Sequence, residues 1–255
     1  MNRREFLFGS VSCAAMSCFG NVDKDEIAEN AVYSHEYMCN EMLKCSKDII
    51  YFAEKYITVH TIWKKHINVE LKDWQKKYLM HLASGKDAVL DACRLSKKTT
   101  TNLIYSLWKT MFKPYQKITF VTCNKRMAEH IFSVVETMYD DLPDWMKSRD
   151  YANEYYMRDA KHIKLKNGSE LVVTYANADF RGYHPGNILI LDEFALFTLE
   201  QQQNMSDTII PVAILHKDVQ LIIASTPFAA DNKFSRYVNA LKNANAPQLF
   251  EITKS

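Results

Sequence analysis

The chain has 255 residues, of which 47% are hydrophobic and 24% are charged, and its formal net charge is +2. This composition is typical of a globular protein with a sizeable core, and the sequence holds no apolar run of about 18 residues that would span a membrane. The six cysteines form no C-x-x-C pair and the histidine spacing completes no zinc site, so we expect reduced thiols without a disulfide framework. The near-neutral charge means that any DNA contact must come from a local patch.

Residues 1–30 are interpreted as a leader or tail. The segment Asn2-Arg3-Arg4-Glu5-Phe6-Leu7 resembles a twin-arginine export signal, and a semi-apolar run from Val11 to Phe19 follows it. Export of the folded protein is one interpretation. The alternatives are a chance match in a loosely structured leader and a start codon placed too far upstream.

Apolar residues at three-to-four spacing predict a helix from Glu26 to about Tyr56 and a second from Leu71 to Leu82, which Gly85 ends. Residues 57–68 are ambiguous between helix and strand. We therefore expect a small helical N-terminal subdomain at 31–70 and a core domain at 71–255.

Strands and helices alternate from Ala88 onward, which favours an α/β fold with a mainly parallel sheet flanked by helices. Strands are expected at 88–92, 117–122, 162–165, 170–175, 188–192, 219–224 and 249–252. Helices are expected at 99–112, 125–139, about 206–214, and 234–241. The sequence Lys166-Asn167-Gly168-Ser169 predicts an Asn-Gly hairpin between the third and fourth of these strands.

Four apolar residues, Ile188 to Leu191, end abruptly in the acid pair Asp192-Glu193. Such a run indicates a strand buried on both faces, and its C-terminal end is where open α/β sheets bind ligands. In a nucleotide-hydrolysing protein the first acid would hold Mg²⁺ and the second would orient a water molecule. The alternative is a strand that ends in a solvated turn.

The turn after the first core strand, Ala92 to Thr101, compares with the phosphate-loop pattern G-x-x-x-x-G-K-[ST]. Lys98 and Thr99 take the Lys and Ser/Thr positions, whereas Ala92 and Lys97 fill both glycine positions. An ordinary basic helix N-terminus is the alternative. The position after a strand, at the start of a helix and ahead of Asp192-Glu193, favours a nucleotide site.

From about Cys45 to the C-terminus, this set of motifs resembles the ATPase domain of the large terminase subunit, the DNA-packaging motor of tailed phages. The matching segments are 71–79, 93–100, 165–169, 180–182, 188–195 and 223–227. The resemblance implies a P-loop NTPase fold of the RecA/ASCE type, with ATP and Mg²⁺ as ligands.

The resemblance also implies roles for individual residues. The expected ATP-binding residues are Gln75, which would read adenine, and Ser96, Lys97, Lys98, Thr99, Thr100 and Thr226. Thr99 and Asp192 would hold Mg²⁺, and Glu193 would be the general base. Arg94 would stabilise charge in the transition state, and Thr226 would sense the γ-phosphate.

Simpler alternatives stay open for several of these residues. Gln75 could be an exposed helix residue, and Arg94 could be a salt-bridge partner. Thr226 could be a turn residue before Pro227, and Arg181 could anchor its own loop.

The sequence departs from the family pattern in two ways. Lys97 replaces a glycine that the family keeps, and the hypothesis is that ATP binding is retained or weakened and hydrolysis is slow. The chain stops at Ser255, whereas the family continues into a nuclease domain. We therefore expect the C-terminal nuclease domain to be absent and no metal-dependent DNA cleavage. Asp140 and Asp141, the only adjacent Asp pair, are expected to be solvated.

The resemblance implies a motor that couples ATP hydrolysis to packaging of double-stranded DNA into the procapsid. Its partners would be double-stranded DNA, the portal protein and the small terminase subunit, in a homo-oligomeric ring without a membrane. The expected location is the cytoplasm of the infected bacterial host, because an ATP-driven enzyme outside it would lack fuel. The alternatives are a degenerate, non-hydrolysing terminase fragment that binds nucleotide or DNA, and a helicase-like ATPase.

Overall fold

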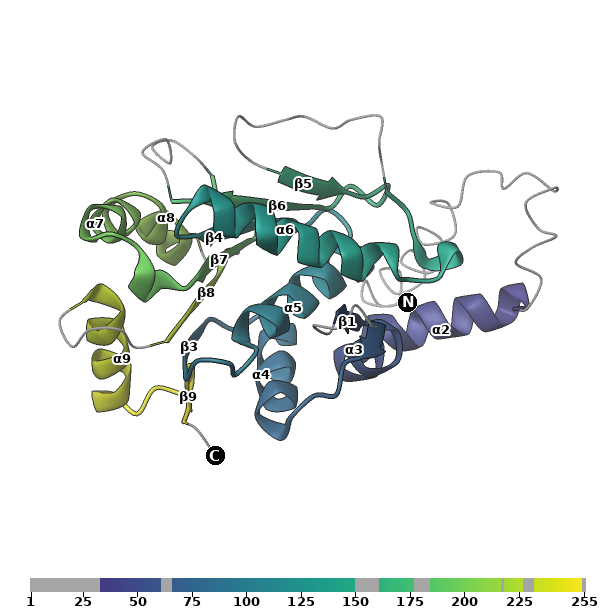
Figure 1. Cartoon of the computed structure of the whole chain (residues 1–255), viewed down its shortest axis with the longest axis horizontal. Coiled ribbons are helices and arrows are strands. Elements are labelled where there is room, and N and C mark those ends of the chain that lie inside the picture. The colour runs from purple at the N-terminus through teal and green to yellow at the C-terminus, as the bar shows by residue number, and fades with distance from the viewer. Residues whose placement is uncertain are drawn as a thin grey trace, which may run out of the picture.

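The structure is a computed structural model, and it describes residues 33–60, 66–149, 161–176, 184–216, 218–226 and 232–253. Within these residues a seven-stranded sheet has the order β5-β6-β4-β7-β8-β3-β9 (Figure 1). The strands are β3 (Ala88–Ala92), β4 (Lys117–Thr122), β5 (Lys161–Lys164), β6 (Glu170–Tyr175), β7 (Ile188–Asp192), β8 (Gln220–Ser225) and β9 (Leu249–Ile252). Neighbouring strands are parallel except β5 and β6. The predicted mainly parallel sheet is confirmed, and the leader at 1–30 lies outside the described residues.

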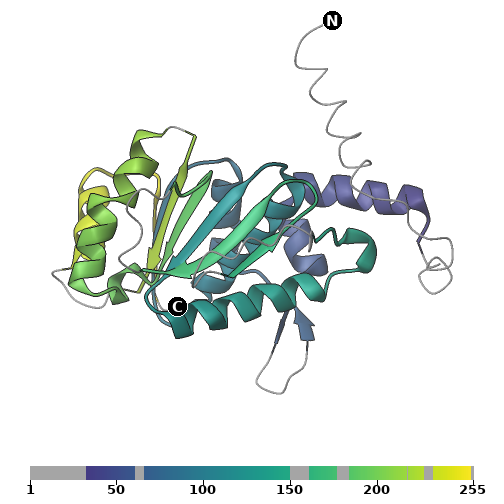
Figure 2. The same cartoon turned by 90° about the horizontal axis from the view of Figure 1, so that it is seen from above.

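The central strand β7 is buried along its whole length because apolar residues face both sides of the sheet. Ile188 and Ile190 belong to one core cluster, whereas Leu189 and Leu191 belong to another. Helices α4 (Asp73–Ala83), α5 (Lys98–Phe112) and α6 (Lys125–Asp140) cover the first face. Helices α7 (Leu199–Asp207), α8 (Ile209–Leu215) and α9 (Lys233–Asn243) cover the second. In Figure 2 the teal helix α6 and the green helices α7 and α8 lie on opposite sides of the strands.

The predicted Asn-Gly hairpin joins β5 and β6, which pair in antiparallel fashion. Gly168 has φ +79°, and a Cβ there would lie 2.7 Å from the ring of Tyr115, so this position requires glycine. The Asn167 amide donates to the carbonyls of Thr110 and Met111 at the end of α5. The hairpin is therefore fixed against the helix that begins at the phosphate loop.

The N-terminal part differs from the single helix predicted for residues 26–56. Two helices form, α2 (His35–Lys47) and α3 (Ile49–Tyr56), and they separate at Asp48. The Asp48 carboxylate accepts hydrogen bonds from the backbone N–H groups of Ile50 and Tyr51, so it caps α3 and interrupts the helical pattern. The buried apolar residues of α2 and α3 belong to the same core cluster as those of α5. The domain boundary at residue 70 remains a prediction.

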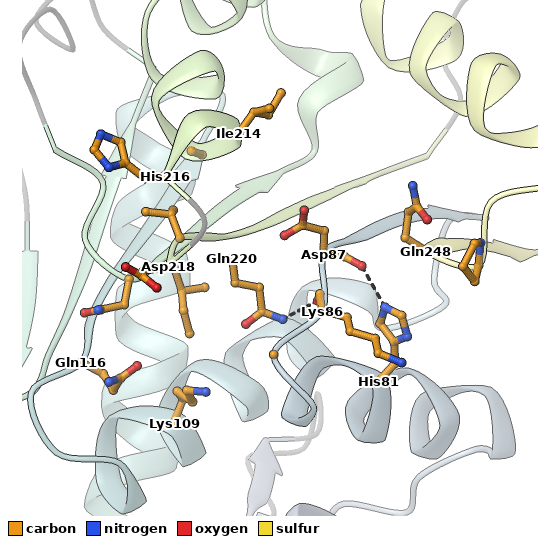
Figure 3. Close-up of a pocket in the computed structure, with 16 residues that line it drawn as sticks. His81, Lys86, Asp87, Lys109, Gln116, Ile214, His216, Asp218, Gln220 and Gln248 are labelled. Carbon is orange, nitrogen blue, oxygen red and sulfur yellow. Dashed lines mark hydrogen bonds between the residues drawn. The ribbon is translucent and has the colours of Figure 1, made fainter. Parts of the chain in front are cut away.

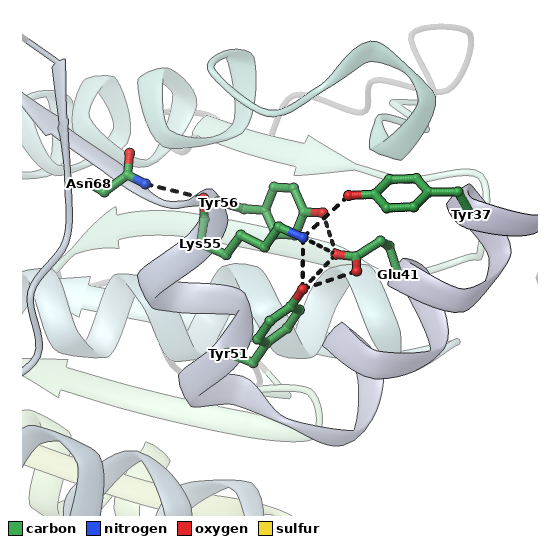
Figure 4. Close-up of polar contacts among 6 residues, drawn as sticks. All are labelled: Tyr37, Glu41, Tyr51, Lys55, Tyr56 and Asn68. Carbon is green, nitrogen blue, oxygen red and sulfur yellow. Dashed lines mark hydrogen bonds and ion pairs between the residues drawn. The ribbon is translucent and has the colours of Figure 1, made fainter. Parts of the chain in front are cut away.

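A polar cluster joins α2 to α3 (Figure 4). The Glu41 carboxylate accepts hydrogen bonds from Tyr51 and Tyr56 and forms a 2.7 Å ion pair with Lys55. Burial alone would raise the pKa of Glu41, but the bonds from Lys55, Tyr56 and Tyr51 lower it to about 2. The Lys55 ammonium also lies 3.3 Å from the Tyr37 hydroxyl, so one cation is shared by residues of both helices.

The ambiguous segment 57–68 contains a short antiparallel pair, β1 (Thr58–His60) and β2 (His66–Asn68). Asp141, at the C-terminal end of α6, accepts hydrogen bonds from the Thr58 hydroxyl and, at 2.6 Å, from His66 Nδ1. The expectation that Asp141 is merely solvated was wrong, because this pair of strands packs on the end of α6. In the described part of the chain, none of the helices is long and apolar enough to cross a membrane.

The helix expected near 206–214 is instead two helices, α7 and α8, and the first begins earlier than predicted. The Thr198 hydroxyl accepts a hydrogen bond from Gln201 N–H, and the Gln201 side chain accepts one from Thr198 N–H. This reciprocal cap sets the start of α7 directly after the acid pair and the short 3-10 helix η4 (Phe194–Leu196).

Candidate functional site

The carboxyl ends of three neighbouring strands build the candidate site. In the sheet, β8 lies between β3, which precedes the phosphate-loop segment, and β7, which ends in Asp192. These strands are parallel, so their carboxyl ends lie on the same side of the sheet. The segments that follow them are 93–97, the acid pair and Thr226. The sheet therefore brings together residues that lie more than a hundred positions apart in the sequence.

The phosphate-loop segment follows β3 and ends where α5 begins, at Lys98. Lys97 has φ 66° and ψ 26°, in the left-handed region that normally favours glycine, and Leu95 has φ 66°. The Lys97 side chain is exposed, so it finds room away from the loop. Lys97 thus adopts a backbone conformation that glycine would adopt without strain, at a cost of roughly 1–2 kcal/mol for a residue with a Cβ.

Lys98 lies at the centre of the site and is 5% exposed. Its ammonium forms an ion pair with Glu193 at 2.8 Å and donates a hydrogen bond to the Thr226 hydroxyl at 2.8 Å. The next residue, Thr99, donates from its hydroxyl to Asp192 Oδ2 at 2.7 Å. Five predicted site residues, from the start of α5 and the ends of β7 and β8, are therefore linked by direct contacts.

Asp192 is fully buried, and its Oδ1 atom has no hydrogen-bond partner among the described residues. Burial raises the pKa of Asp192 to about 7, with a further upward contribution from Glu193, although the Thr99 hydrogen bond and Lys98 act in the opposite direction. The Asn102 amide also acts on this carboxylate and lowers its pKa. The Asp192 carboxylate and the Thr99 hydroxyl are oxygen ligands of the kind that Mg²⁺ prefers. The described residues hold no cluster of three or more His, Cys, Asp or Glu that would enclose a metal.

Glu193 has φ 55° and ψ 40°, a left-handed conformation that is uncommon for a residue other than glycine. The backbone turns sharply here between β7 and η4, which directs the carboxylate back toward Lys98 and the end of β8. Glu193 Oε2 lies 3.4 Å from the Ser225 hydroxyl and 3.5 Å from Thr226 N. Strain of this kind often accompanies functional residues.

Three further predicted residues lie around this centre. Arg94 is exposed and forms no ion pair with any described residue, so the salt-bridge alternative gains no support there. Thr100 is half-buried in the first turn of α5. Ser96 is half-buried, and its hydroxyl oxygen has no partner within the described residues. Arg181 and Pro227 lie outside those residues.

Gln75 is not the exposed residue of the simpler interpretation, because it is 3% exposed. Its amide oxygen accepts a hydrogen bond from Lys72 N–H at 3.0 Å, and its amide nitrogen donates to the Thr101 hydroxyl at 2.7 Å. The role in reading adenine remains a prediction.

Sequence reasoning missed two residues that the structure places at the site. Thr101 is fully buried and links Gln75 to the phosphate loop, and its position in a run of three threonines gave no signal for this. The Ser225 hydroxyl accepts a hydrogen bond from Ala195 N–H at 3.0 Å and faces Glu193. Ser225 therefore ties the end of β8 to the turn that carries the acid pair.

A cavity of about 790 Å³ lies at the opposite, N-terminal ends of the strands, where β3, β7 and β8 begin (Figure 3). None of the predicted site residues lines it. Gln220 donates to the Lys86 carbonyl and accepts from the Tyr105 hydroxyl, and His81 bonds to the Asp87 carbonyl. Burial, together with the charge of Lys113, lowers the pKa of Lys109 in the cavity wall. The cavity is separate from the candidate site.

No protein-family model matches the sequence. Among solved structures, the large terminase of bacteriophage HK97 is similar with a TM-score of 0.66 and 15% identity, over 82% of this chain and 43% of that one. The large terminase of a thermophilic bacteriophage, in complex with ADP, has a TM-score of 0.54 and 14% identity, over 72% and 46%. The UvsW helicase of bacteriophage T4 has a TM-score of 0.50 and 11% identity, over 82% and 67%.

A mainly parallel sheet in which one strand separates the phosphate-loop strand from the acid-bearing strand defines the P-loop NTPase fold of the RecA/ASCE type. More closely, the chain has a large terminase-like fold, that of the ATPase part of phage large terminases. The predicted fold class and the family resemblance at the level of fold are confirmed. The chain spans less than half the length of these two terminases.

Proposed function

We propose that the chain is the ATPase part of a large terminase, which couples ATP hydrolysis to the packaging of double-stranded DNA into a procapsid. The observation that carries the proposal is the contact of Lys98 with both Glu193 and Thr226. A lysine at the start of the helix after the phosphate loop, together with an acid and a threonine that follow two neighbouring strands, provides groups that phosphoryl transfer to water uses.

The roles follow from the positions of these groups. Lys98 would neutralise the β- and γ-phosphates of ATP, which compete with Glu193 for the same ammonium. Once the phosphates hold Lys98, the Glu193 carboxylate is available to accept a proton from the attacking water. Thr226 bonds to Lys98 at the end of β8. Loss of the γ-phosphate would therefore change this contact and the position of the end of β8.

Thr99 and Asp192 would hold Mg²⁺, and the ion would supply charge neutralisation at the phosphates. Arg94, exposed within the phosphate-loop segment, would extend toward the γ-phosphate to stabilise charge in the transition state. The backbone N–H groups at the start of α5 would add to the same anion site.

The terminase proposal brings partners with it. These are double-stranded DNA, the portal protein and the small terminase subunit, in a homo-oligomeric ring. The corresponding location is the cytoplasm of an infected bacterium.

Two other functions have observations in their favour. A non-hydrolysing relative that binds nucleotide or DNA is favoured by Lys97, because the missing glycine loads the phosphate loop with strain. A helicase-like ATPase is favoured by the fold similarity to UvsW.

Hydrolysis assays on the wild type and Glu193→Gln, with and without DNA, separate these functions. The terminase motor is supported if double-stranded DNA stimulates wild-type hydrolysis and Glu193→Gln binds ATP without turnover. Equal inactivity of both, with ATP still bound, supports the non-hydrolysing relative. Stimulation by single-stranded DNA with separation of a partial duplex supports the helicase. Absence of nucleotide binding refutes the motor and the helicase, and absence of both nucleotide and DNA binding refutes all three.

A further inference from the structure

The buried amide of Gln75 lies between two helices, at the third position of α4 and against the first turn of α5. Its surroundings fix which way the amide points. Lys72 N–H is a donor, so the amide oxygen must face Lys72, and the amide nitrogen then faces the Thr101 hydroxyl at 2.7 Å.

The direction of the next hydrogen bond follows from the same reasoning. Because the Thr101 oxygen accepts from Gln75, its hydrogen is free to donate, and the Lys97 carbonyl lies 3.0 Å away. Threonine in a helix divides between two side-chain rotamers, and the Gln75 amide selects the one that reaches back to this carbonyl. A continuous chain of hydrogen bonds therefore runs from the start of α4 through Gln75 and Thr101 to Lys97.

This chain ends at the strained residue of the phosphate loop. Lys97 has φ 66°, and its carbonyl accepts both the N–H and the hydroxyl of Thr101, each at 3.0 Å. A glycine would adopt this conformation without help, whereas a lysine needs its surroundings to hold it there. The same contacts leave Gln75 only 3% exposed, with little surface for a nucleobase.

We propose that Gln75 is a positioning residue that acts through Thr101 to hold Lys97 in the conformation the phosphate loop requires, and that it does not read the nucleobase. The part of this proposal that concerns nucleotide affinity rests on the proposed function. Gln75 is needed in this role because position 97 holds a lysine and not a glycine.

The test is a double-mutant cycle of Gln75→Ala and Lys97→Gly, with Mg²⁺-ATP and Mg²⁺-GTP binding measured for each variant. Loss of one internal hydrogen bond predicts that Gln75→Ala weakens both nucleotides by the same factor, about 3- to 10-fold. In the Lys97→Gly background the loss shrinks to less than about 2-fold, because glycine needs no support. Selective weakening of ATP would instead identify Gln75 as a base reader and overturn the proposal.

Tyr78→Phe is the matched control. The Tyr78 hydroxyl donates to Asn102 at 3.0 Å, joining α4 to α5 one turn further on without touching Lys97. Its effect is expected to be the same with lysine or glycine at position 97. If Gln75→Ala behaves in the same way, Gln75 merely joins the helices and caps α4, and the proposal is wrong.

Thermal unfolding without nucleotide gives a second readout of the cycle. Gln75→Ala is expected to lower the Tm more in the wild-type background than in the Lys97→Gly background, whereas Tyr78→Phe lowers it equally in both. If the wild type binds no nucleotide, the proposed function fails, but the unfolding cycle still decides whether Gln75 supports Lys97. Additive Tm changes for Gln75→Ala and Lys97→Gly would overturn the proposal by themselves.

Discussion

Replacing Lys97 by glycine is expected to stabilise the folded protein, although it removes a side chain. Lys97 has φ 66°, and a left-handed conformation costs an L-residue roughly 1–2 kcal/mol. Glycine avoids this cost but loses about 0.5–1 kcal/mol through the greater freedom of its unfolded chain. The Lys97 side chain is exposed, so little packing is lost. The free energy of unfolding should therefore rise by about 0.5–1 kcal/mol, or about 1–3 °C in Tm.

Denaturant or thermal unfolding of the nucleotide-free protein measures this change. Lys77→Gly is the matched control, because Lys77 is also an exposed lysine but lies inside the helix α4. That substitution should destabilise the fold by about 1 kcal/mol, since glycine is unfavourable in a helix. If both variants lose stability to the same extent, Lys97 is not strained and the reasoning fails.

Three further predictions concern the site and the α2–α3 contact. Glu193→Gln should reduce ATP hydrolysis by about 10²-fold or more while nucleotide binding is kept or tightened, because Lys98 no longer has an anionic partner; a variant as active as the wild type would contradict this. Asp192→Asn should remove the dependence of ATP affinity on Mg²⁺, which ATP titrations with and without the ion would measure. A dependence as strong as in the wild type would contradict the role of Asp192. The pKa of Glu41 is lowered from its ordinary 4.5 to about 2, so its stabilising effect is complete above about pH 4.5 and is lost as the pH falls toward 2. Acid unfolding curves should therefore be less steep in this window for Glu41→Gln than for the wild type, and identical curves would refute the role of the Lys55 contact.

The sheet was predictable because its strands are short apolar runs with clear boundaries. Ile188 to Leu191 is apolar on both faces, and only a strand covered on both sides satisfies that pattern. The order of the strands was not readable from spacing. Long-range pairing places β8 between β3 and β7, and no local signal encodes it.

The missed boundaries have local physical causes. Apolar spacing continues across Asp48, but the Asp48 side chain competes for the backbone N–H groups that a continuous helix would use. Thr198 and Gln201 carried a capping signal that the apolar pattern of the next helix obscured. The strands β1 and β2 have three residues each, and their Thr58 and His66 side chains bond to Asp141, which lies far away in the sequence.

The phosphate-loop pattern, the acid pair and the family resemblance pointed to Lys98, Thr99, Asp192, Glu193 and Thr226, and the structure places these residues in contact. Their roles stay predictions. Spacing could not predict the conformation of Lys97 or the burial of Gln75. The first depends on the backbone turn between β3 and α5. The second depends on how closely α4 packs on α5, which is a property of the folded core.

Strand β8 runs from the cavity at its N-terminal end to the candidate site at its carboxyl end. Gln220 at its start lies in the wall of the cavity and accepts a hydrogen bond from Tyr105, and Thr226, directly after its end, bonds to Lys98. Six strand residues span about 20 Å and do not stretch, because β7 and β3 hold both sides. Strand β8 is therefore a stiff connection between the cavity and the candidate site. If Thr226 moves along the strand axis when it separates from Lys98, we expect Gln220 at the other end of β8 to move with it.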